Sequence, residues 1–371
     1  MSTLNELYDT YGQSPWIDNI RRDWLNDGTL AQLVADGARG VTSNPAIFAK
    51  AFATSSAYDS LVSGVGSTDP ETVFEALAVA DVRDACDVLR PVYDASVAEQ
   101  EAGQRRFTDG YVSLEVSPRL AHDTAGTIDA AQRLFAAVDR PNVMIKIPAT
   151  IEGLPAITAV LGLGINVNVT LIFSLQRYQA VLDAWTAGVA LAVANGHDIR
   201  HLASVASFFV SRVDAAVDDL LPSDDARRGC VANAQVAAAY ETYLAHVASE
   251  PVMELLMAGG QVQRPLWAST STKNPSYDEL LYVNSIVANE TVNTMPDPTL
   301  AATLAKGDFA QSLLLDAASR TAAVALLVSL EGEVSLDDVT LTLERDGVAA
   351  FIRSYDDLLA LVQEKLDKGQ Q

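Results

Sequence analysis

The sequence predicts an α/β protein built as a single (β/α)8 barrel of the TIM type, with extra helices. Three observations favour this fold. Short apolar, β-branched runs recur along the 371 residues, stretches with helical periodicity separate them, and the runs number eight, which is enough to close a barrel. An open doubly wound sheet is the alternative, but no glycine-rich nucleotide-binding motif follows the first run.

Each expected strand is a short run bounded by polar or turn residues. In chain order the runs are 14–20, 37–43, 110–116, 142–148, 165–173, 202–210, 264–270 and 282–289. Helical periodicity between them is clearest over 129–138 and 176–195. We expect one domain over residues 1–371. The long gaps predict helical insertions at about 46–109 and 211–263, and apolar residues at steps of three and four predict a C-terminal helix at about 347–368, packed on the barrel.

Composition and charge exclude several classes of function. Hydrophobic residues make up 49% of the chain, so a large core is expected. The 25 basic and 48 acidic residues give a net charge of −23, which argues against nucleic-acid or anionic-membrane partners. No apolar run reaches about 18 residues, the start lacks a signal-peptide core, and two cysteines make no disulfide framework. We expect a cytoplasmic protein, and nothing in the sequence indicates its oligomeric state.

Polar residues of one parity interrupt several of the runs. Buried parallel strands usually read as continuous apolar segments. Here Asn168 and Thr170 alternate with valines and leucine, and Ser113 and Glu115 share one face of an earlier run. We expect the apolar set, which includes Leu171, to face the helices and the polar set to point into the barrel. These polar residues lie near the carboxyl ends of the strands, where barrel active sites form.

Lys146 is the sharpest single feature. It is one of only six lysines, and apolar residues flank it in the fourth run. Burial favours the neutral form of a lysine, and a neutral amine can attack a carbonyl to form a Schiff base. The alternatives are a lysine that extends from the strand end to solvent, or an ion pair with Glu115. Glu115 itself has Arg119 as an alternative charge partner.

Two polar residues lie at the ends of the first two runs. Asp18 lies at the end of the first, where it is a candidate general acid or base. Asn44 follows the second, in front of Pro45, and is a candidate ligand-binding residue. Both have a structural alternative as the N-cap of the next helix.

Cationic and hydroxyl groups after the later runs predict an anion site. Arg212 follows the sixth run, and its alternative role is an ion pair with Asp214. Ser269, Ser271 and Lys273 follow the seventh, where loops of such barrels often bind phosphate. A metal is not expected. His197 and His201 have helical metal-ligand spacing, but they precede the sixth run and belong to the opposite end of the barrel.

Taken together, six segments resemble the transaldolase family of the class I aldolase superfamily, in particular its longer bacterial members. They are GVTSNPAIF, SLEVSPRLAHDT, NVMIKIPAT, INVNVTLIFS, ASFFVSRVD and RPLWASTSTKNP. The resemblance implies an enzyme of the non-oxidative pentose phosphate pathway. It would transfer a dihydroxyacetone unit from sedoheptulose 7-phosphate or fructose 6-phosphate to glyceraldehyde 3-phosphate or erythrose 4-phosphate, with no metal or organic cofactor.

The resemblance also implies roles for individual residues. Lys146 would form the imine, Asp18 would take the hydroxyl proton that drives carbon–carbon cleavage, and Glu115 with Thr170 would handle protons through a shared water. The implied substrate-binding residues are Thr42, Asn44, Asn168, Ser207, Phe209, Arg212, Ser269, Ser271 and Lys273. Many family members carry a second phosphate-binding arginine shortly after the position of Ser269. We expect Lys273 to substitute for it.

Two other functions are also compatible with the sequence. A fructose-6-phosphate aldolase-type enzyme would release free dihydroxyacetone, but the family pattern then has tyrosine at Phe209 and glutamine at Glu115. A non-catalytic sugar-phosphate-binding barrel would bind the same ligands without a covalent adduct, and the set of Asp18, Glu115, Lys146 and Thr170 argues against it.

Overall fold

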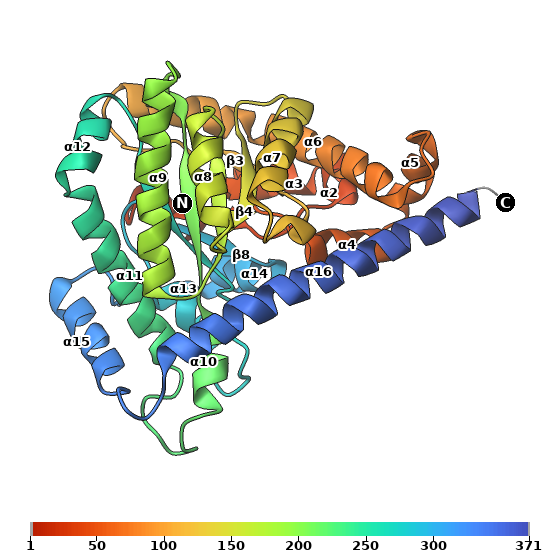
Figure 1. Cartoon of the computed structure of the whole chain (residues 1–371). Helices are drawn as coiled ribbons and strands as arrows, with labels where there is room; N and C mark the ends of the chain where they lie inside the picture. Colours follow the sequence, from red (N-terminus) through yellow and green to blue (C-terminus); the bar gives the residue numbers. More distant parts are fainter. Residues whose placement is uncertain (1–2, 370–371) are drawn as a thin grey trace.

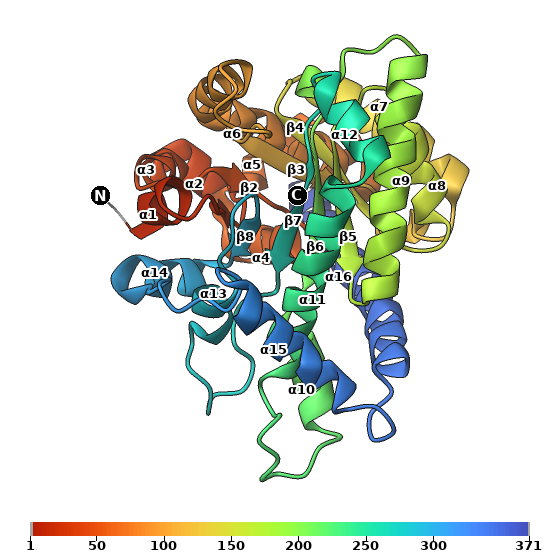
Figure 2. The same cartoon turned by 90° about the vertical axis from the view of Figure 1, so that its left-hand side faces the viewer.

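The computed structural model describes residues 3–369. Eight parallel strands form a closed barrel in the order β1 to β8, and helices surround it (Figures 1 and 2). The predicted (β/α)8 barrel is therefore confirmed. The strands are β1 Ser14–Ile17, β2 Gly40–Val41, β3 Tyr111–Glu115, β4 Val143–Pro148, β5 Val167–Ile172, β6 Ser204–Phe209, β7 Gln263–Ala268 and β8 Val292–Met295.

The helices before the fifth strand are α1 Thr3–Asp9, α2 Arg22–Asp27, α3 Thr29–Ala35, α4 Pro45–Thr54, α5 Asp59–Gly64, α6 Pro70–Glu101, α7 Thr124–Val138 and α8 Gly153–Gly162. Those after it are α9 Leu175–Ala194, α10 Ser211–Asp218, α11 Val231–Val247, α12 Glu250–Met257, α13 Leu281–Ser285, α14 Asp297–Lys306, α15 Ala317–Val328 and α16 Leu336–Gly369. Short 3₁₀ turns lie at Ser56–Tyr58, Pro118–Leu120 and Ile199–His201. No helix among residues 3–369 is long and apolar enough to cross a membrane.

The eighth predicted strand is wrong. The run 282–289 lies in α13 and the segment after it, and the true strand β8 comes a few residues later. β8 is only four residues long, and Asn293 and Thr294 make it look like a loop in the sequence. It closes the barrel because it pairs with β1 on one side and β7 on the other. Burial in the sheet, rather than local β-propensity, makes this segment a strand.

Strand parity follows the prediction except at one bulge. Val143, Ile145 and Ile147 lie in the main core between barrel and helices. In β5 the pairing with β6 shifts between Val169 and Ile172, and Leu171 adopts φ 59°. A bulge inserts a residue and re-aims its neighbours. Leu171 therefore leaves the helix-facing set, against the sequence prediction, and packs in a second apolar cluster with Phe173, Phe209, Val348 and Phe351.

The C-terminal helix is longer than predicted and lies across the end of the barrel. It spans Leu336–Gly369 rather than about 347–368, and it runs from α10 toward α4 and α5 (Figure 1). Polar contacts fix it along its length: Glu344 pairs with Arg177 at 3.2 Å, and the Tyr355 hydroxyl donates to Glu71 Oε1 at 2.8 Å. At Gly347 the helix approaches β5 so closely that an added Cβ would lie 3.1 Å from Leu171 Cδ2.

Candidate active site

A cavity of about 300 Å³ opens at the carboxyl ends of the strands. Barrel strands present the residues that follow them at this end, so side chains from distant parts of the chain meet there. Most of the residues predicted for the site line this cavity: Asp18, Thr42, Asn44, Lys146, Thr170, Ser207, Phe209, Arg212, Ser269, Ser271 and Lys273. Glu115 and Asn168 are the two predicted residues that do not.

Lys146 reaches the cavity from the middle of β4. Its side chain is almost completely buried, and Nζ donates a hydrogen bond to the Ser43 carbonyl oxygen at 3.0 Å. Nζ also lies 3.2 Å from Glu115 Oε2 and 5.7 Å from the centre of the Phe351 ring. The ion pair with Glu115 that we considered as an alternative is therefore present. The same amine still lines the cavity, so pairing and access to a ligand coexist.

Glu115 stands beside Lys146 because β3 and β4 pair these two residues in register. Its carboxyl is buried, and burial raises its pKa to about 7, against the opposing effect of the Lys146 charge. Such a carboxyl can both donate and accept a proton near neutral pH. The alternative partner Arg119 does not contact it, since Arg119 pairs with Asp356 and Glu71.

Asp18 follows β1 directly and faces the cavity rather than capping a helix. The N-cap position of α2 is Arg21, so the N-cap alternative for Asp18 is wrong. Thr42 Oγ1 donates to Asp18 Oδ1 at 2.7 Å and lies equally close to Thr294 Oγ1. Burial raises the pKa of Asp18, while Lys146 and the Thr42 hydrogen bond act in the opposite direction. A carboxylate with a raised pKa is a stronger base than usual.

Asn44 both caps a helix and lines the cavity. Its Oδ1 accepts the Ile47 N–H at the start of α4, as the structural alternative predicted, and its Nδ2 remains a donor for a ligand. Asn168 is oriented inside the barrel by one hydrogen bond at each end of its amide, which leaves a second N–H and a second oxygen lone pair for a ligand. Its Nδ2 donates to Ser113 Oγ at 2.9 Å, and Ser207 Oγ donates to its Oδ1 at 2.8 Å.

Thr170 presents an unused hydroxyl to the cavity. The side chain is fully buried, and Oγ1 has no hydrogen-bond partner among residues 3–369. The next residue is Leu171, whose left-handed conformation costs about 1–2 kcal/mol because its Cβ comes too close to a backbone carbonyl oxygen. Backbone strain of this kind concentrates at functional sites.

Two cations lie at the mouth of the cavity without a carboxylate partner. No ion pair of Arg212 or Lys273 is present in the described chain, 3–369. The predicted alternative for Arg212 is wrong, since Asp214 instead accepts hydrogen bonds from the Ala232 N–H and the Tyr282 hydroxyl. Lys273 Nζ donates to Ser271 Oγ at 2.8 Å, and desolvation and Arg212 lower the pKa of Lys273. Unpaired cations beside hydroxyl groups suit a phosphate.

Residues 15–362 match the family described as transaldolase/fructose-6-phosphate aldolase. The chain belongs to this family. It is 47% identical to a transaldolase of Saccharopolyspora erythraea over 376 residues, which cover 100% of this chain and 99% of that protein. It is 45% identical to a transaldolase of Thiobacillus denitrificans over 359 residues, 95% of this chain and 97% of the relative. Transaldolase 1 of Streptomyces avermitilis is 47% identical over 99% of this chain and 96% of its own length.

Phe351 is the main residue of the cavity that sequence reasoning missed in this member of the transaldolase/fructose-6-phosphate aldolase family. It lies on α16, lines the cavity and is almost completely buried. Its place in the apolar pattern of the C-terminal helix was the available signal, but that pattern indicates packing and not a ligand. Thr294 also lines the cavity from β8, the strand that the sequence misplaced.

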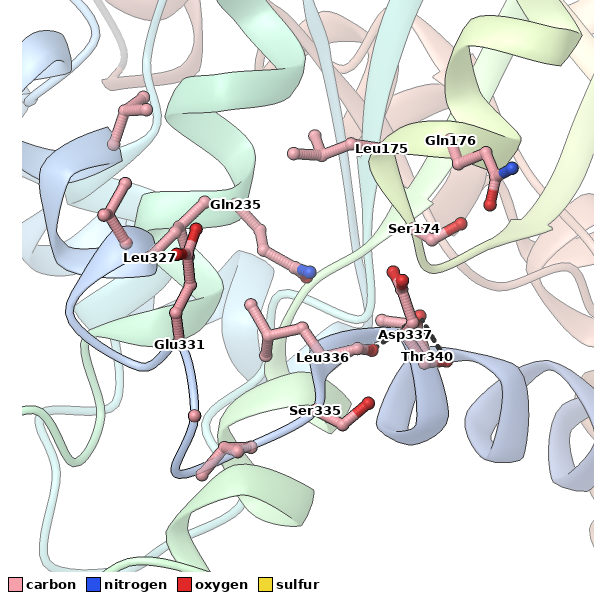
Figure 3. A pocket seen from close by; sticks show the side chains of 14 residues that line it. Ser174, Leu175, Gln176, Gln235, Leu327, Glu331, Ser335, Leu336, Asp337 and Thr340 are labelled. Carbon is pink, nitrogen blue, oxygen red and sulfur yellow. Dashed lines mark hydrogen bonds between the residues drawn. The ribbon is translucent and has the colours of Figure 1, made fainter.

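A second, larger cavity of about 450 Å³ lies between α9, α11 and the segment from α15 into α16. Figure 3 shows Gln235, Glu331 and Asp337 around it. Among the residues that line it are two carboxylates and no lysine, arginine or histidine. An acidic lining repels phosphate, so size alone does not make this cavity the sugar-phosphate site. Within residues 3–369 no three His, Cys, Asp or Glu side chains are grouped to hold a metal ion.

Proposed function

We propose that the protein is a transaldolase that carries a three-carbon dihydroxyacetone unit on Lys146. The donor is sedoheptulose 7-phosphate or fructose 6-phosphate, and the acceptor is glyceraldehyde 3-phosphate or erythrose 4-phosphate. One observation carries the proposal: the Lys146 amine is buried at the carboxyl end of β4, paired with Glu115 and open to a cavity that ends in two unpaired cations. The transaldolase names of the full-length relatives support it.

In the first step Lys146 gives its proton to Glu115 across the ion pair, and the neutral amine that results adds to the C2 carbonyl of the ketose. Glu115, with a pKa of about 7, gives a proton to the departing hydroxyl group, which leaves as water. The product is a protonated imine on Lys146 and a carboxylate on Glu115. The free hydroxyl of Thr170 supports this proposal, because it can hold the water that forms when Glu115 protonates the departing hydroxyl group.

In the second step Asp18 takes the proton of the C4 hydroxyl. The C3–C4 bond breaks, the aldose phosphate leaves, and the electron pair of the bond moves into the imine as an enamine. The acceptor aldehyde then adds at the same carbon, and Asp18 returns the proton. Thr42 orients Asp18 through its 2.7 Å hydrogen bond. We assign sugar hydroxyl groups to Asn44 and Ser207, and we assign Asn168 the task of holding Ser207 in position.

The phosphate of either sugar would lie between Arg212 and Lys273, with the Ser269 and Ser271 hydroxyls beside them. Arg212 packs against Phe209, its guanidinium carbon 5.9 Å from the ring centre, which limits its motion. A lysine binds phosphate as a point charge and an arginine as a fork, so Arg212 would give the direction and Lys273 additional charge. The absence of a competing carboxylate pair for either cation within 3–369 supports this assignment.

Transfer is favoured over release of dihydroxyacetone by the residues around the imine. Phe209 and Glu115 stand where the aldolase-type pattern has tyrosine and glutamine. Phe351 covers the amine with an apolar ring, which keeps water from protonating the enamine. A fructose-6-phosphate aldolase-type activity, which the family name also includes, is the second candidate.

Borohydride trapping tests the proposed function. The protein is incubated with fructose 6-phosphate, reduced, digested and analysed by mass. We expect a three-carbon adduct on the peptide that contains Lys146, and no adduct in Lys146→Ala. Addition of erythrose 4-phosphate before the reductant discharges the adduct from a transaldolase. Sugar-phosphate binding without any adduct would instead identify a non-catalytic barrel.

A further inference from the structure

A third cavity, of about 190 Å³, reaches Glu115 from the side of the barrel. It lies between β3, α6, α7 and α16, and its lining includes Glu115, Ser117, Ala130 and Tyr355. None of its lining residues lines the substrate cavity. The Lys146–Glu115 ion pair thus separates the substrate cavity from the side cavity. The amine of Lys146 lines the substrate cavity, the carboxyl of Glu115 lines the side cavity, and 3.2 Å separates Nζ from Oε2.

The side cavity ends at the buried carboxyl of Glu115, whose Oε2 has Lys146 as its ion-pair partner. Ser117 Oγ also lines this cavity and is buried, and the Ser117 side chain forms a hydrogen bond with Tyr355 that acts to lower the pKa of that tyrosine. Buried polar atoms of this kind are usually satisfied by water where space permits. A water takes about 30 Å³ of liquid volume, so the cavity has room for several.

The outer end of the side cavity is made of charged side chains. Arg119 lies 3.6 Å from Glu71 and 2.7 Å from Asp356, and the Tyr355 hydroxyl donates to the same Glu71. Arg119 is exposed at this rim. The cavity therefore runs from solvated ion pairs to the buried carboxyl of Glu115, whereas Phe351 lies over the amine on the substrate side.

The chemistry of the proposed transaldolase needs such a connection. When Lys146 forms the imine, a C–N bond forms, the C2–O bond breaks and the oxygen leaves as one water. Hydrolysis reverses this and consumes one water. At both moments a sugar phosphate occupies the mouth of the barrel. We propose that the side cavity is a water passage, through which this water exchanges between Glu115 and the solvent. The inference rests on the proposed function, because it assigns a role only if Lys146 forms an imine.

Filling the passage without touching the machinery tests it. Ala130→Leu adds three carbons at a lining position of α7, and Ala136→Leu makes the same change at an exposed position of the same helix. We measure ¹⁸O uptake from labelled water into the ketose carbonyl, together with kcat and KM for transfer. Ala130→Leu is expected to slow both ¹⁸O uptake and kcat several-fold with little change in KM, and Ala136→Leu to leave both unchanged.

A second variant keeps the test valid if Ala130→Leu fails to fold. Ser117→Val replaces the buried hydroxyl with apolar atoms and is expected to slow ¹⁸O uptake in the same way. The proposed water passage is overturned if the Ala130→Leu and Ser117→Val proteins fold and still exchange oxygen as fast as Ala136→Leu. A wild-type protein without any borohydride adduct on Lys146 would instead overturn the proposed function. The two failures are therefore distinguishable.

Discussion

Glu115 and Lys146 are register partners on β3 and β4, and Oε2 of one lies 3.2 Å from Nζ of the other. Adjacent parallel strands place such partners side by side on the same face of the sheet. The proton donor that we assign to imine formation is therefore held beside the nucleophile by backbone pairing. A substrate is not needed to bring the two groups together.

The pH dependence of imine formation tests this pairing. Burial raises the pKa of Glu115 to about 7, so the protonated form that donates is lost as pH rises through about 7. We expect kcat/KM for the ketose to fall on the alkaline side of this value. Glu115→Gln keeps the shape but removes the titration, so it loses this limb of the profile and lowers kcat by roughly 10²-fold. An unchanged alkaline limb in Glu115→Gln would assign the titration to another group.

Asp18→Asn separates imine formation from cleavage. The variant keeps a side chain that accepts the Thr42 hydrogen bond, but it cannot take the C4 hydroxyl proton. We expect kcat to fall by roughly 10²–10⁴-fold. Borohydride then traps the whole fructose 6-phosphate on Lys146 and not the three-carbon unit, and intact mass distinguishes the two adducts. A three-carbon adduct at the wild-type rate would show that another base drives cleavage.

Arg212→Ala is expected to weaken phosphate binding. A hydrogen bond to a charged group contributes about 1.5–3 kcal/mol, which corresponds to a rise in KM of roughly tenfold to a hundredfold. Lys273→Ala should have a smaller effect, and Lys273→Arg should keep or improve binding, because arginine binds phosphate through two donors. Inhibition by inorganic phosphate measures the same contacts without turnover.

A matched control for these charge changes lies at the other end of the barrel. Arg200→Ala removes an exposed arginine that pairs with Asp198 just before β6. It changes the net charge by the same amount but should leave KM unaltered. Equal changes in KM for Arg200→Ala and Arg212→Ala would indicate an effect of the protein's net charge and not a phosphate site at Arg212.

Phe351→Ala is expected to shift the reaction from transfer toward release. Without the ring, water reaches the enamine on Lys146, protonates it and allows free dihydroxyacetone to leave. The ratio of free dihydroxyacetone to transferred product, measured with limiting acceptor, should rise. Phe351→Leu keeps most of the apolar cover and should stay close to wild type. A constant ratio in both variants would exclude this role for the C-terminal helix.

Much of the site follows from the alternation of residues along strands. The parity of β3, β4 and β5 predicts which side chains turn inward, and strand ends predict which of them meet, as Lys146 and Thr170 show. Prediction from strand alternation fails where tertiary contacts determine the secondary structure or the position of a side chain. It misplaced β8, whose polar residues look like a loop, and it overlooked Phe351, because an apolar residue on an amphipathic helix usually packs on a core.

Other differences arise because sequence order does not give partners. Arg212 and Asp214 are close in the chain, yet Asp214 turns into the core to bind Tyr282, which leaves Arg212 free for a ligand. Asn168 has the strand and parity that the sequence predicts, and the structure adds that Ser113 and Ser207 orient its amide. Only the three-dimensional structure shows such competition between neighbours.

The contact between Leu171 and Gly347 has an evolutionary consequence. The bulge that gives Leu171 its left-handed backbone adjoins Thr170 on one side and supports the helix that carries Phe351 on the other. A mutation at residue 171 therefore alters both the inner wall of the cavity and the surface on which the helix that carries Phe351 packs. We expect residues 171 and 347 to vary together among relatives, because a Cβ at 347 would lie 3.1 Å from Leu171 Cδ2, so that the leucine must shift or be replaced by a smaller residue.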